Sequence, residues 1–571
     1  MSNHNEISSF IWRVCDDILR DRFKNYEYGD VILPFLVLRR LDCVLEPKKQ
    51  EVVQLYESIK NEFNDPSEVI NEQVGMTFSN YSKFDLVKLK EDPNKLRVNI
   101  DEYLSGYSTN VREIISFFHL QSVINKLHKN NLLFKLVEIF TQVDLHPNVV
   151  DNHTMGRIFE EILRRFSEMS NETSGEHYTP RDIVQLLVSL VFSPDKEKLK
   201  QEGKIISVFD PCCGTGGMLS VGKDWLNENT PLNQSNINLF GQEINETTYS
   251  ICKSDFLITG ENPNNIKLGS SLSQDGFPEI DRRFDYMITN PPFGVSWKSE
   301  KEYIENESQT GGRFNVGTPR VSDGSLLFLQ HMISKMETQG SSRIGVVFNG
   351  SPLFTGDSGS GESEIRKWII ENDWLECIVS LPDQLFFNTG ISTYIWIVTN
   401  NKRPNRKGKV QLIDGSSFHK SMKKSLGSKR KYIEDSQREE ILQIYEKFEE
   451  NEFSKIYDNE FFGYTKITIE QPKVENGEIV RDKKGNPKPD SKLRDYERVP
   501  LSEDIEEYFS REVEPHLPNS WIDFDKSKEG YEINFTKYFY KYKPLRSSEE
   551  ITRDLLELDK ESENLLNQIM D

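Results

Sequence analysis

IISVFDPCCGTGG, from Ile205 to Gly217, combines a short apolar strand with a glycine-rich turn, and a helix-like segment (MLSVGKDWL) follows it. Glycines at such a turn let a ligand approach the backbone closely, and the helix N-terminus adds N–H donors. The stretch therefore favours a site for a nucleotide-like ligand. It matches neither GxGxxG nor a P-loop, and an ordinary tight turn is the alternative interpretation.

The rest of the chain places this stretch in a larger α/β domain. Short β-rich runs follow at intervals long enough for helices: INLFGQE, FDYMITN, RIGVVFN, LECIVSL and YIWIVTN. This alternation predicts a doubly wound α/β domain, which we assign to residues 171–415. Apolar residues at helical spacing predict a helical domain over residues 1–170. Residues 416–571 are polar and are expected to hold an exposed loop and a helical tail.

The last helix is expected to bind a partner. A cap signal at Ser547 and Ser548 opens it, and Ile551, Leu555 and Leu558 begin an apolar stripe that continues to Leu565 and Ile569. Abundant charge between these positions leaves the stripe facing solvent unless another helix covers it.

Composition excludes several classes of protein. No apolar run approaches the roughly 18 residues of a membrane helix, and MSNHNEISSF lacks a secretory signal, so we expect a cytoplasmic protein without a membrane. Six cysteines without a CxxC pair, and histidines without paired ligand spacing, argue against a metal site. A net charge of −21 opposes binding of nucleic acid by the chain alone. If the chain acts on DNA, a partner or a local basic patch must supply much of the affinity.

Two further motifs follow predicted strands. Glu243 ends INLFGQE, where a carboxylate typically accepts hydrogen bonds from ribose hydroxyls; a solvated strand end is the alternative. NPPF, Asn290 to Phe293, follows FDYMIT. Its two prolines cannot continue a ladder, and they fix an extended backbone that presents a carbonyl and an asparagine amide. We interpret NPPF as a functional site rather than a mere strand terminator.

Together with GEHYTPR (Gly175 to Arg181), these motifs resemble the amino-group DNA methyltransferases that use S-adenosylmethionine, in the motif order of the γ class. More closely, the chain resembles the modification subunit of type I restriction-modification systems. DGSLLFLQHM (323–332) and the segment 343–398 also match that family's pattern, so that the resemblance covers nearly the whole chain.

The resemblance implies a catalytic role for NPPF. Adenine N6 is a poor nucleophile because its lone pair is delocalised into the ring. The side-chain oxygen of Asn290 and the carbonyl of Pro291 would localise it, Pro292 would fix the geometry, and Phe293 would stack on an adenine flipped out of double-stranded DNA. Cys212 superficially resembles a cytosine-methylase nucleophile, but its position in the turn favours packing or cofactor contact.

The resemblance also implies S-adenosylmethionine as cofactor. Its expected contacts are Glu176, His177, Tyr178, Thr179, Pro180 and Arg181 near the methionine part, Asp210, Gly214, Thr215, Gly216 and Gly217 in the turn, and Glu243 on the ribose. Relatives often carry an aspartate after a glycine near the third strand, where this chain has Ser270 after Gly269. A serine hydroxyl can still meet the cofactor's adenine.

The implied partners are DNA and a separate specificity subunit, with two copies of this chain per specificity subunit and room for a restriction subunit. No segment remains for target recognition, because the tail is too short for two such domains. The basic run 420–431 is either a solvated loop or a phosphate-contacting strip. A protein-glutamine methyltransferase, whose NPP motif normally ends in tyrosine, and a non-catalytic scaffold subunit are the alternative functions.

Overall fold

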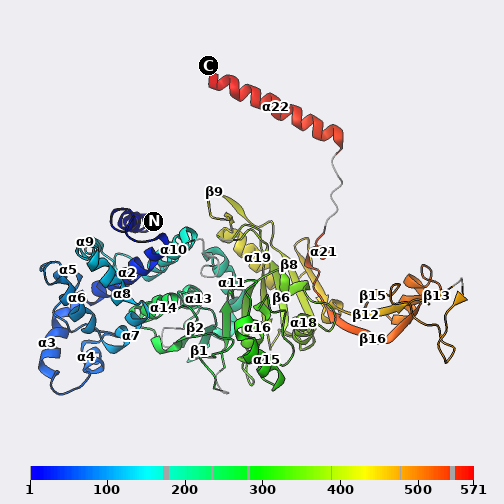
Figure 1. The fold of residues 1–571 in the computed structure, drawn as a ribbon, viewed down its shortest axis with the longest axis horizontal. Coiled ribbons are helices and arrows are strands. Elements are labelled where there is room, and N and C mark those ends of the chain that lie inside the picture. Colours follow the sequence, from blue (N-terminus) through cyan, green and yellow to red (C-terminus); the bar gives the residue numbers. More distant parts are fainter. Residues whose placement is uncertain are drawn as a thin grey trace. The chain divides into compact units, whose positions relative to one another are not determined.

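The computed structural model describes residues 2–170, 179–201, 203–232, 236–279, 283–387, 389–475, 478–540 and 547–570 (Figure 1). Its contacts divide the chain into two units, one ending at Ile533 and the other beginning at Asn534. No described helix is both long and apolar enough to cross a membrane.

A nine-stranded sheet forms the centre of the first unit, in the order β11-β8-β6-β7-β5-β4-β1-β2-β3. Its strands are β1 (Ile206–Asp210), β2 (Ile237–Glu243), β3 (Ile266–Leu268), β4 (Tyr286–Thr289), β5 (Arg343–Asn349), β6 (Leu375–Ser380), β7 (Thr393–Thr399), β8 (Lys409–Asp414) and β11 (Ser454–Asp458). The first five run parallel, and β7 is antiparallel to both of its neighbours. The chain winds outward on both sides of β1, which confirms the doubly wound prediction. Ligands of such sheets bind at the carboxyl ends of the strands where the winding reverses, here β1 and β4.

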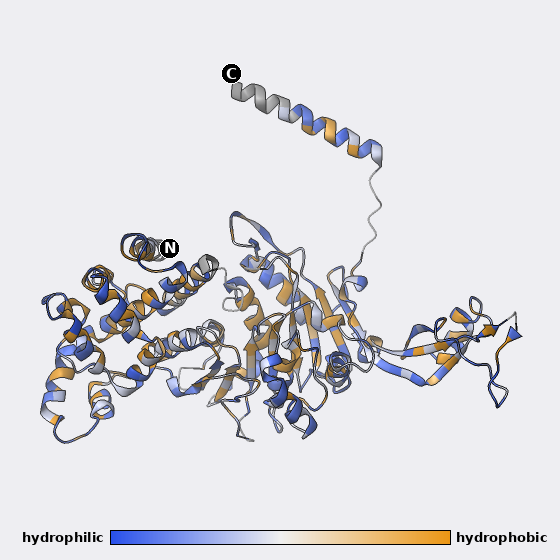
Figure 2. Ribbon diagram, viewed as in Figure 1, coloured by the Kyte–Doolittle hydropathy of each residue, from blue (hydrophilic) through white to orange (hydrophobic). Residues whose placement is uncertain are grey.

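Both faces of the sheet are buried, which explains why its strands read as continuous apolar runs (Figure 2). Val208 shares one core with four helices, whereas the ring of Phe209 stacks at 4.4 Å on Phe284 at the opposite face. The four helices are α11 (Arg181–Phe192), α13 (Gly217–Asn229), α14 (Glu246–Thr259) and α19 (Asp435–Lys447). Further helices of this region are α12 (Lys196–Leu199), α15 (Lys301–Gln309), α16 (Ser325–Ser334), α17 (Ser351–Phe354) and α18 (Gly361–Glu371).

The described N-terminal region is built from helices and one isolated β-bridge between Asn80 and Tyr107, in agreement with the predicted fold class. The helices are α1 (Ser2–Val14), α2 (Tyr28–Leu45), α3 (Lys49–Ile59), α4 (Ser67–Val74), α5 (Leu86–Leu89), α6 (Leu96–Ser105), α7 (Thr109–Phe117), α8 (Leu120–Lys129), α9 (Leu133–Phe140) and α10 (Asn152–Ser170). Their core includes Ile251 and Leu257 of α14, and Lys253 Nζ lies 2.9 Å from a carboxylate oxygen of Glu113. The N-terminal helices are therefore packed against the sheet domain.

The region after β8 contains more β structure than the expected helical tail. β11 pairs with β8, so the large sheet continues past the proposed boundary at residue 415. Three strands form a second sheet around Ile467, Ile469 and Val499: β12 (Gly463–Glu470), β15 (Asp495–Pro500) and β16 (Trp521–Tyr531). The remaining elements are the pairs β9 (Lys420–Leu426) with β10 (Lys429–Tyr432) and β13 (Val474–Glu475) with β14 (Glu478–Ile479), and the short helix α20 (Ile505–Tyr508).

The second unit contains α21 (Phe535–Tyr538) and α22 (Ser548–Met570). The Ser547 hydroxyl accepts the Glu550 N–H at 3.2 Å, and a Glu550 carboxylate oxygen accepts the Ser547 N–H at 3.1 Å. This reciprocal cap confirms the predicted start of the helix. Leu555 and Leu558 are each 61% exposed, whereas the side chains of Leu565 and Ile569 lie outside the described residues.

Candidate active site

The buried carboxyl of Asp210 joins the glycine turn to the NPPF segment. One of its oxygens accepts the Cys212 N–H at 2.9 Å and the Thr289 hydroxyl at 2.7 Å. Because Thr289 immediately precedes Asn290, these bonds fix both segments at the carboxyl ends of β1 and β4. Burial raises the pKa of Asp210 to about 7.

This pKa predicts how Asp210→Asn changes stability with pH. The folded chain holds a proton on Asp210 up to about pH 7, whereas the unfolded carboxyl loses it near 3.8. The free energy of unfolding of the wild type therefore decreases as the pH rises from about 4 to about 7, by a few kcal/mol at most. Asparagine keeps the accepting oxygen and cannot ionise. The free energy of unfolding of the variant, relative to that of the wild type, should therefore increase as the pH rises over this range. Urea unfolding of both proteins at pH 5 and pH 8 measures the difference, and parallel pH profiles would contradict it.

Two glycines of the turn are required by its geometry. Gly216 has φ +84°, and a side chain there would place Cβ 2.9 Å from the sulfur of Cys252. At Gly217 a Cβ would lie 2.6 Å from a carboxylate oxygen of Glu160, which α10 supplies. Arg181 lies 3.5 Å from that Glu160 oxygen and donates to the Gly217 carbonyl at 3.3 Å. The N-terminal helices thus reach the turn.

The side-chain amide of Asn290 is hydrogen-bonded through its nitrogen, whereas its oxygen is left without a partner among the described residues. Its side-chain nitrogen donates to the hydroxyl of Thr179 at 2.8 Å, which brings the described end of GEHYTPR to NPPF. Its side-chain oxygen is buried and has no hydrogen-bond partner among the described residues. Since an unpaired buried acceptor is costly, this oxygen is suited to receive a donor from a bound molecule.

Eight of the sixteen predicted site residues line two neighbouring cavities. The turn cavity is lined by Glu160, Thr179, Val184, Asp210, Cys212, Cys213, Gly214, Thr215, Gly217, Met218 and Asn290. The apolar cavity is lined by Pro211, Cys212, Glu243, Ile244, Gly269, Ser270, Ser271, Leu272, Pro292, Val295, Ser296, Trp297, Glu300, Gly324 and Phe328. Cys212 borders both cavities.

Glu243 holds the turn in this structure. Its two carboxylate oxygens accept the backbone N–H groups of Gly214 and Asn245, each at 2.8 Å. These bonds place the carboxylate at the wall of the apolar cavity. The solvated strand end that was the alternative is wrong, because Glu243 is only 8% exposed.

The remaining predicted residues are placed as follows. Phe293 is half-buried, and its ring meets that of Phe386 edge-on at 5.8 Å. Pro180 and Pro291 are buried. Glu176, His177 and Tyr178 lie outside the described residues. Within the described part of the chain, no cluster of three or more His, Cys, Asp or Glu side chains could hold a metal ion.

The thiol of Cys212 stays protonated. Burial raises its pKa well above the usual value, and the nearby carboxyls of Asp210 and Glu243 raise it further. A thiolate is the nucleophilic form of cysteine, so this environment opposes a covalent role.

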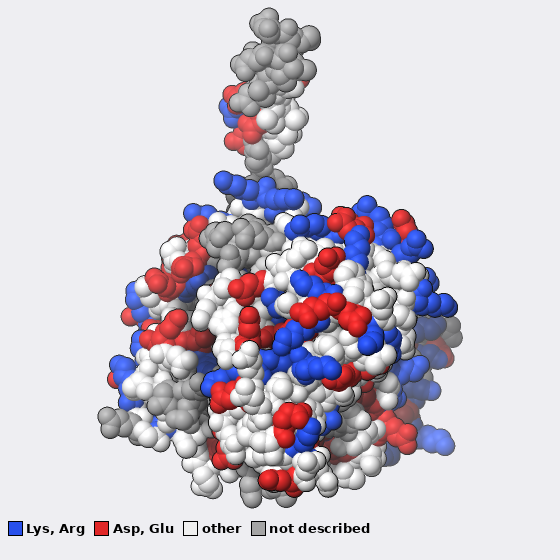
Figure 3. Space-filling model, turned by 90° about the vertical axis from the view of Figure 1, so that its left-hand side faces the viewer, with Lys and Arg blue, Asp and Glu red and all other residues white. Residues whose placement is uncertain are grey.

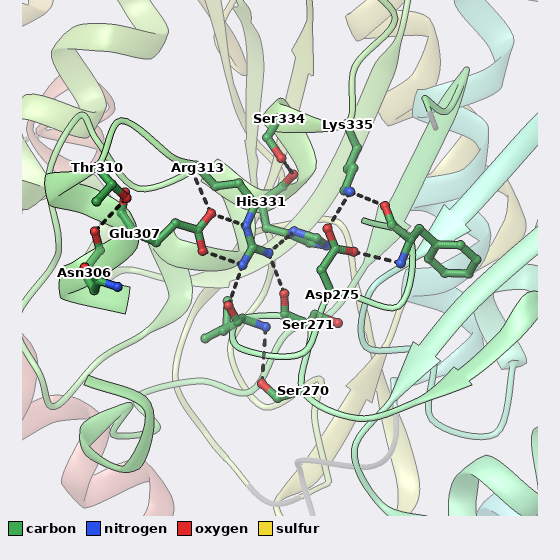
Figure 4. A network of polar contacts seen from close by, with 12 residues as sticks. Ser270, Ser271, Asp275, Asn306, Glu307, Thr310, Arg313, His331, Ser334 and Lys335 are labelled. Carbon is green, nitrogen blue, oxygen red and sulfur yellow. Dashed lines mark hydrogen bonds and ion pairs between the residues drawn. The ribbon is translucent and has the colours of Figure 1, made fainter. Parts of the chain in front are cut away.

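A partly buried network fixes the loop after β3 (Figure 4). Arg313 donates to the carbonyls of Ser271 and Leu272 at 2.8 and 2.6 Å. Its guanidinium also forms bonds of 2.7 and 2.8 Å with Glu307 and one of 2.8 Å with the ring of His331. Burial, followed by the charge of Arg313, lowers the pKa of His331 to about 3, so the imidazole remains neutral. The network gives one wall of the apolar cavity a fixed shape.

Charge is mixed on the face that Figure 3 shows, where basic and acidic side chains alternate. The basic run forms the β9–β10 pair, and half of its charges are paired within the chain. Lys420 lies 2.9 Å from Glu434, buried Lys429 lies 3.4 Å from Asp182, and Lys431 pairs with Asp383. Lys423, Lys424 and Arg430 are exposed and form no ion pair within the described residues. A phosphate-contacting strip would thus rest on these three.

Comparison with known proteins agrees with this geometry. The family model described as N-6 DNA Methylase matches residues 150–467, which is more than half of the chain. The chain belongs to the N-6 DNA methylase family. A second model, of the HsdM N-terminal domain, matches residues 7–140 of this methylase. The methylase is the modification subunit of a type I restriction-modification system, and it is a DNA adenine methyltransferase that uses S-adenosylmethionine.

Individual relatives are consistent with the family. The methylase is 25% identical over 493 residues to the type I restriction enzyme MjaIX methylase subunit of Methanocaldococcus jannaschii, with 83% of each chain covered. It is 32% identical over 263 residues to the HindI methylase subunit of Haemophilus influenzae, covering 46% of this chain and 54% of the relative.

Solved structures show the same fold. A type I methyltransferase subunit from Streptococcus thermophilus superposes with a TM-score of 0.63 at 20% identity, over 80% of this chain and 96% of that one. A chain from work on assembly and conformational transition of the type I system gives a TM-score of 0.50 at 19% identity, over 100% and 97%.

Proposed function

We propose that this chain methylates adenine N6 at one DNA sequence, and that a separate specificity subunit reads that sequence. The observation that carries the proposal is the buried, unpartnered side-chain oxygen of Asn290. It lies at the carboxyl end of β4, in a cavity shared with the glycine turn.

The chemistry of the amine explains why such an acceptor is needed. The N6 lone pair of adenine is delocalised into the ring, and hydrogen bonds from both N6 hydrogens draw it back onto nitrogen. The Asn290 oxygen accepts one hydrogen and the Pro291 carbonyl accepts the other. In this structure the Thr179 hydroxyl accepts from the amide nitrogen, which leaves the Asn290 oxygen as the group presented to a ligand. No covalent enzyme intermediate is required, in keeping with the protonated thiol of Cys212.

The target adenine must leave the duplex to reach this site. Phe293 offers a half-buried ring supported edge-on by Phe386, which suits stacking of a flipped base. Pro292 limits the freedom of the backbone between the accepting groups and this ring.

The two cavities fit S-adenosylmethionine. The turn cavity is lined by Gly214, Thr215 and Gly217, beside the unpartnered oxygen of Asn290. The apolar cavity, with Glu243 in its wall, suits a purine nucleoside whose ribose hydroxyls the carboxylate accepts. When bound, the cofactor supplies the methyl group from its sulfonium. The described part of GEHYTPR, Thr179 to Arg181, would border the methionine end.

Sequence recognition is assigned to the partner. A net charge of −21 opposes unaided binding to a polyanion. The apolar stripe of α22 offers a surface for a helix of the specificity subunit, with two copies of this chain per specificity subunit and a restriction subunit able to join. The similarity to a chain from a type I assembly supports subunit partners in general.

The experiment compares this chain alone with its mixture with the specificity subunit. By calorimetry, the chain alone should bind S-adenosylmethionine. Methylation of a cognate duplex should rise at least tenfold when the specificity subunit is added, because that subunit supplies most of the DNA affinity. Full sequence-specific methylation by the chain alone would contradict the division of labour. Absence of cofactor binding would favour the non-catalytic scaffold.

A further inference from the structure

The loop after β3 lacks the expected acidic side chain, but a carboxylate reaches it from elsewhere in the chain. The hydroxyls of Ser270 and Ser273 both donate to the same carboxylate oxygen of Glu300, the second at 2.6 Å. Glu300 is 30 residues further along the chain than Ser270 and lines the apolar cavity together with it. The two serines therefore orient a carboxylate at this wall.

Glu300 has no evident structural task beyond these bonds. It occupies the N-cap position of α15, yet its side chain makes no capping hydrogen bond. Within the described residues, it forms no ion pair with a lysine or an arginine. It is half-buried, so that a carboxylate with unused acceptor capacity faces a partly desolvated cavity.

The cavity around it suits a purine ring. Ile244, Leu272 and Phe328 give it apolar walls, and Glu243 borders the same space. The Arg313 network holds the Ser271 and Leu272 carbonyls in place, so this wall is fixed before a ligand enters (Figure 4). An adenine in this cavity would need an acceptor for its exocyclic amino group, because a buried unpaired donor is costly.

We propose that Glu300 accepts a hydrogen bond from the amino group of the cofactor's adenine and thereby selects adenine over purines that lack this donor. The inference rests on the proposed function, in which the apolar cavity takes the nucleoside of S-adenosylmethionine. Serine hydroxyls alone can donate or accept, and so they discriminate poorly. A carboxylate only accepts, and Ser270 and Ser273 use their hydrogens to hold it.

The test measures binding of two ligands by calorimetry, without methyl transfer. The ligands are S-adenosylhomocysteine and its analogue in which hydrogen replaces the amino group on C6 of the purine. The wild type should bind the amino compound about ten- to a hundredfold more tightly, as expected for a hydrogen bond to a charged acceptor. In Glu300→Ala this ratio should fall close to one.

The ratio of the two affinities separates recognition of the amino group from a loss of structure, because a disturbed loop weakens the binding of both ligands equally. Glu302→Ala, which removes an exposed carboxylate of α15, should keep the wild-type ratio. Glu300→Gln retains an accepting oxygen and should give an intermediate ratio. An unchanged ratio in Glu300→Ala would overturn the inference and leave the proposed function standing. Failure of the wild type to bind S-adenosylhomocysteine at all would instead overturn the proposed function.

Discussion

Removal of residues 547–571 should leave a chain that binds S-adenosylmethionine but no longer assembles with its specificity subunit or methylates DNA at a defined site. α22 belongs to the second unit, and the first unit, with both cavities, is complete without it. Its leucines at 555 and 558 are each 61% exposed on one stripe, where a helical partner would cover them. Assembly should weaken by about a hundredfold or more, because these leucines are the apolar anchors that a helical partner would bury.

The decisive measurement is the mass of the mixed subunits by size-exclusion chromatography with light scattering. The double variant Leu555→Glu, Leu558→Glu keeps the chain length and should also prevent assembly. Arg553→Glu makes the same change in net charge on the opposite side of the helix and should assemble normally. Normal assembly of the truncated chain would exclude α22 as the docking element.

Local sequence signals were enough to predict the centre of the fold and much of the candidate site. The glycine turn, Glu243 and NPPF each follow a strand, and the carboxyl ends of neighbouring parallel strands meet at one edge. That rule predicts their proximity, and the structure brings Thr179 to Asn290 as well. The family match then established the fold class and the enzyme. The roles of the individual residues stay proposals.

Contacts between distant segments could not be predicted in this way. Glu160 reaches Gly217 from the N-terminal helices. The spacing of apolar residues in that helix predicts only a buried face and says nothing about where Glu160 points. Glu300 meets Ser270 from 30 residues further along the chain, and no motif marks its position. Arg313 acts through backbone carbonyls, which carry no side-chain signal. The sequence does not predict the second sheet, because the alternation of apolar and polar residues in β12 is short and lies within a polar region.

Asn290→Ala should lower methyl transfer by roughly a hundred- to a thousandfold, the usual cost of removing one preorganised group that stabilises a developing charge. Cofactor affinity should change little, because in the proposed role the lost oxygen serves the reacting amine rather than the cofactor. Thr179→Val is the matched control. It removes the hydroxyl that orients the amide but keeps the accepting oxygen, so it should cause a smaller loss.

The measurement that tests the account most directly is single-turnover methylation of a cognate duplex by the assembled complex, followed by identification of the methylated nucleoside. With wild-type chain the product should be N6-methyldeoxyadenosine at one site. With Asn290→Ala the rate of its formation should collapse while S-adenosylmethionine still binds in calorimetry. A wild-type rate in that variant, or a methyl group on any other atom, would contradict the role assigned to Asn290.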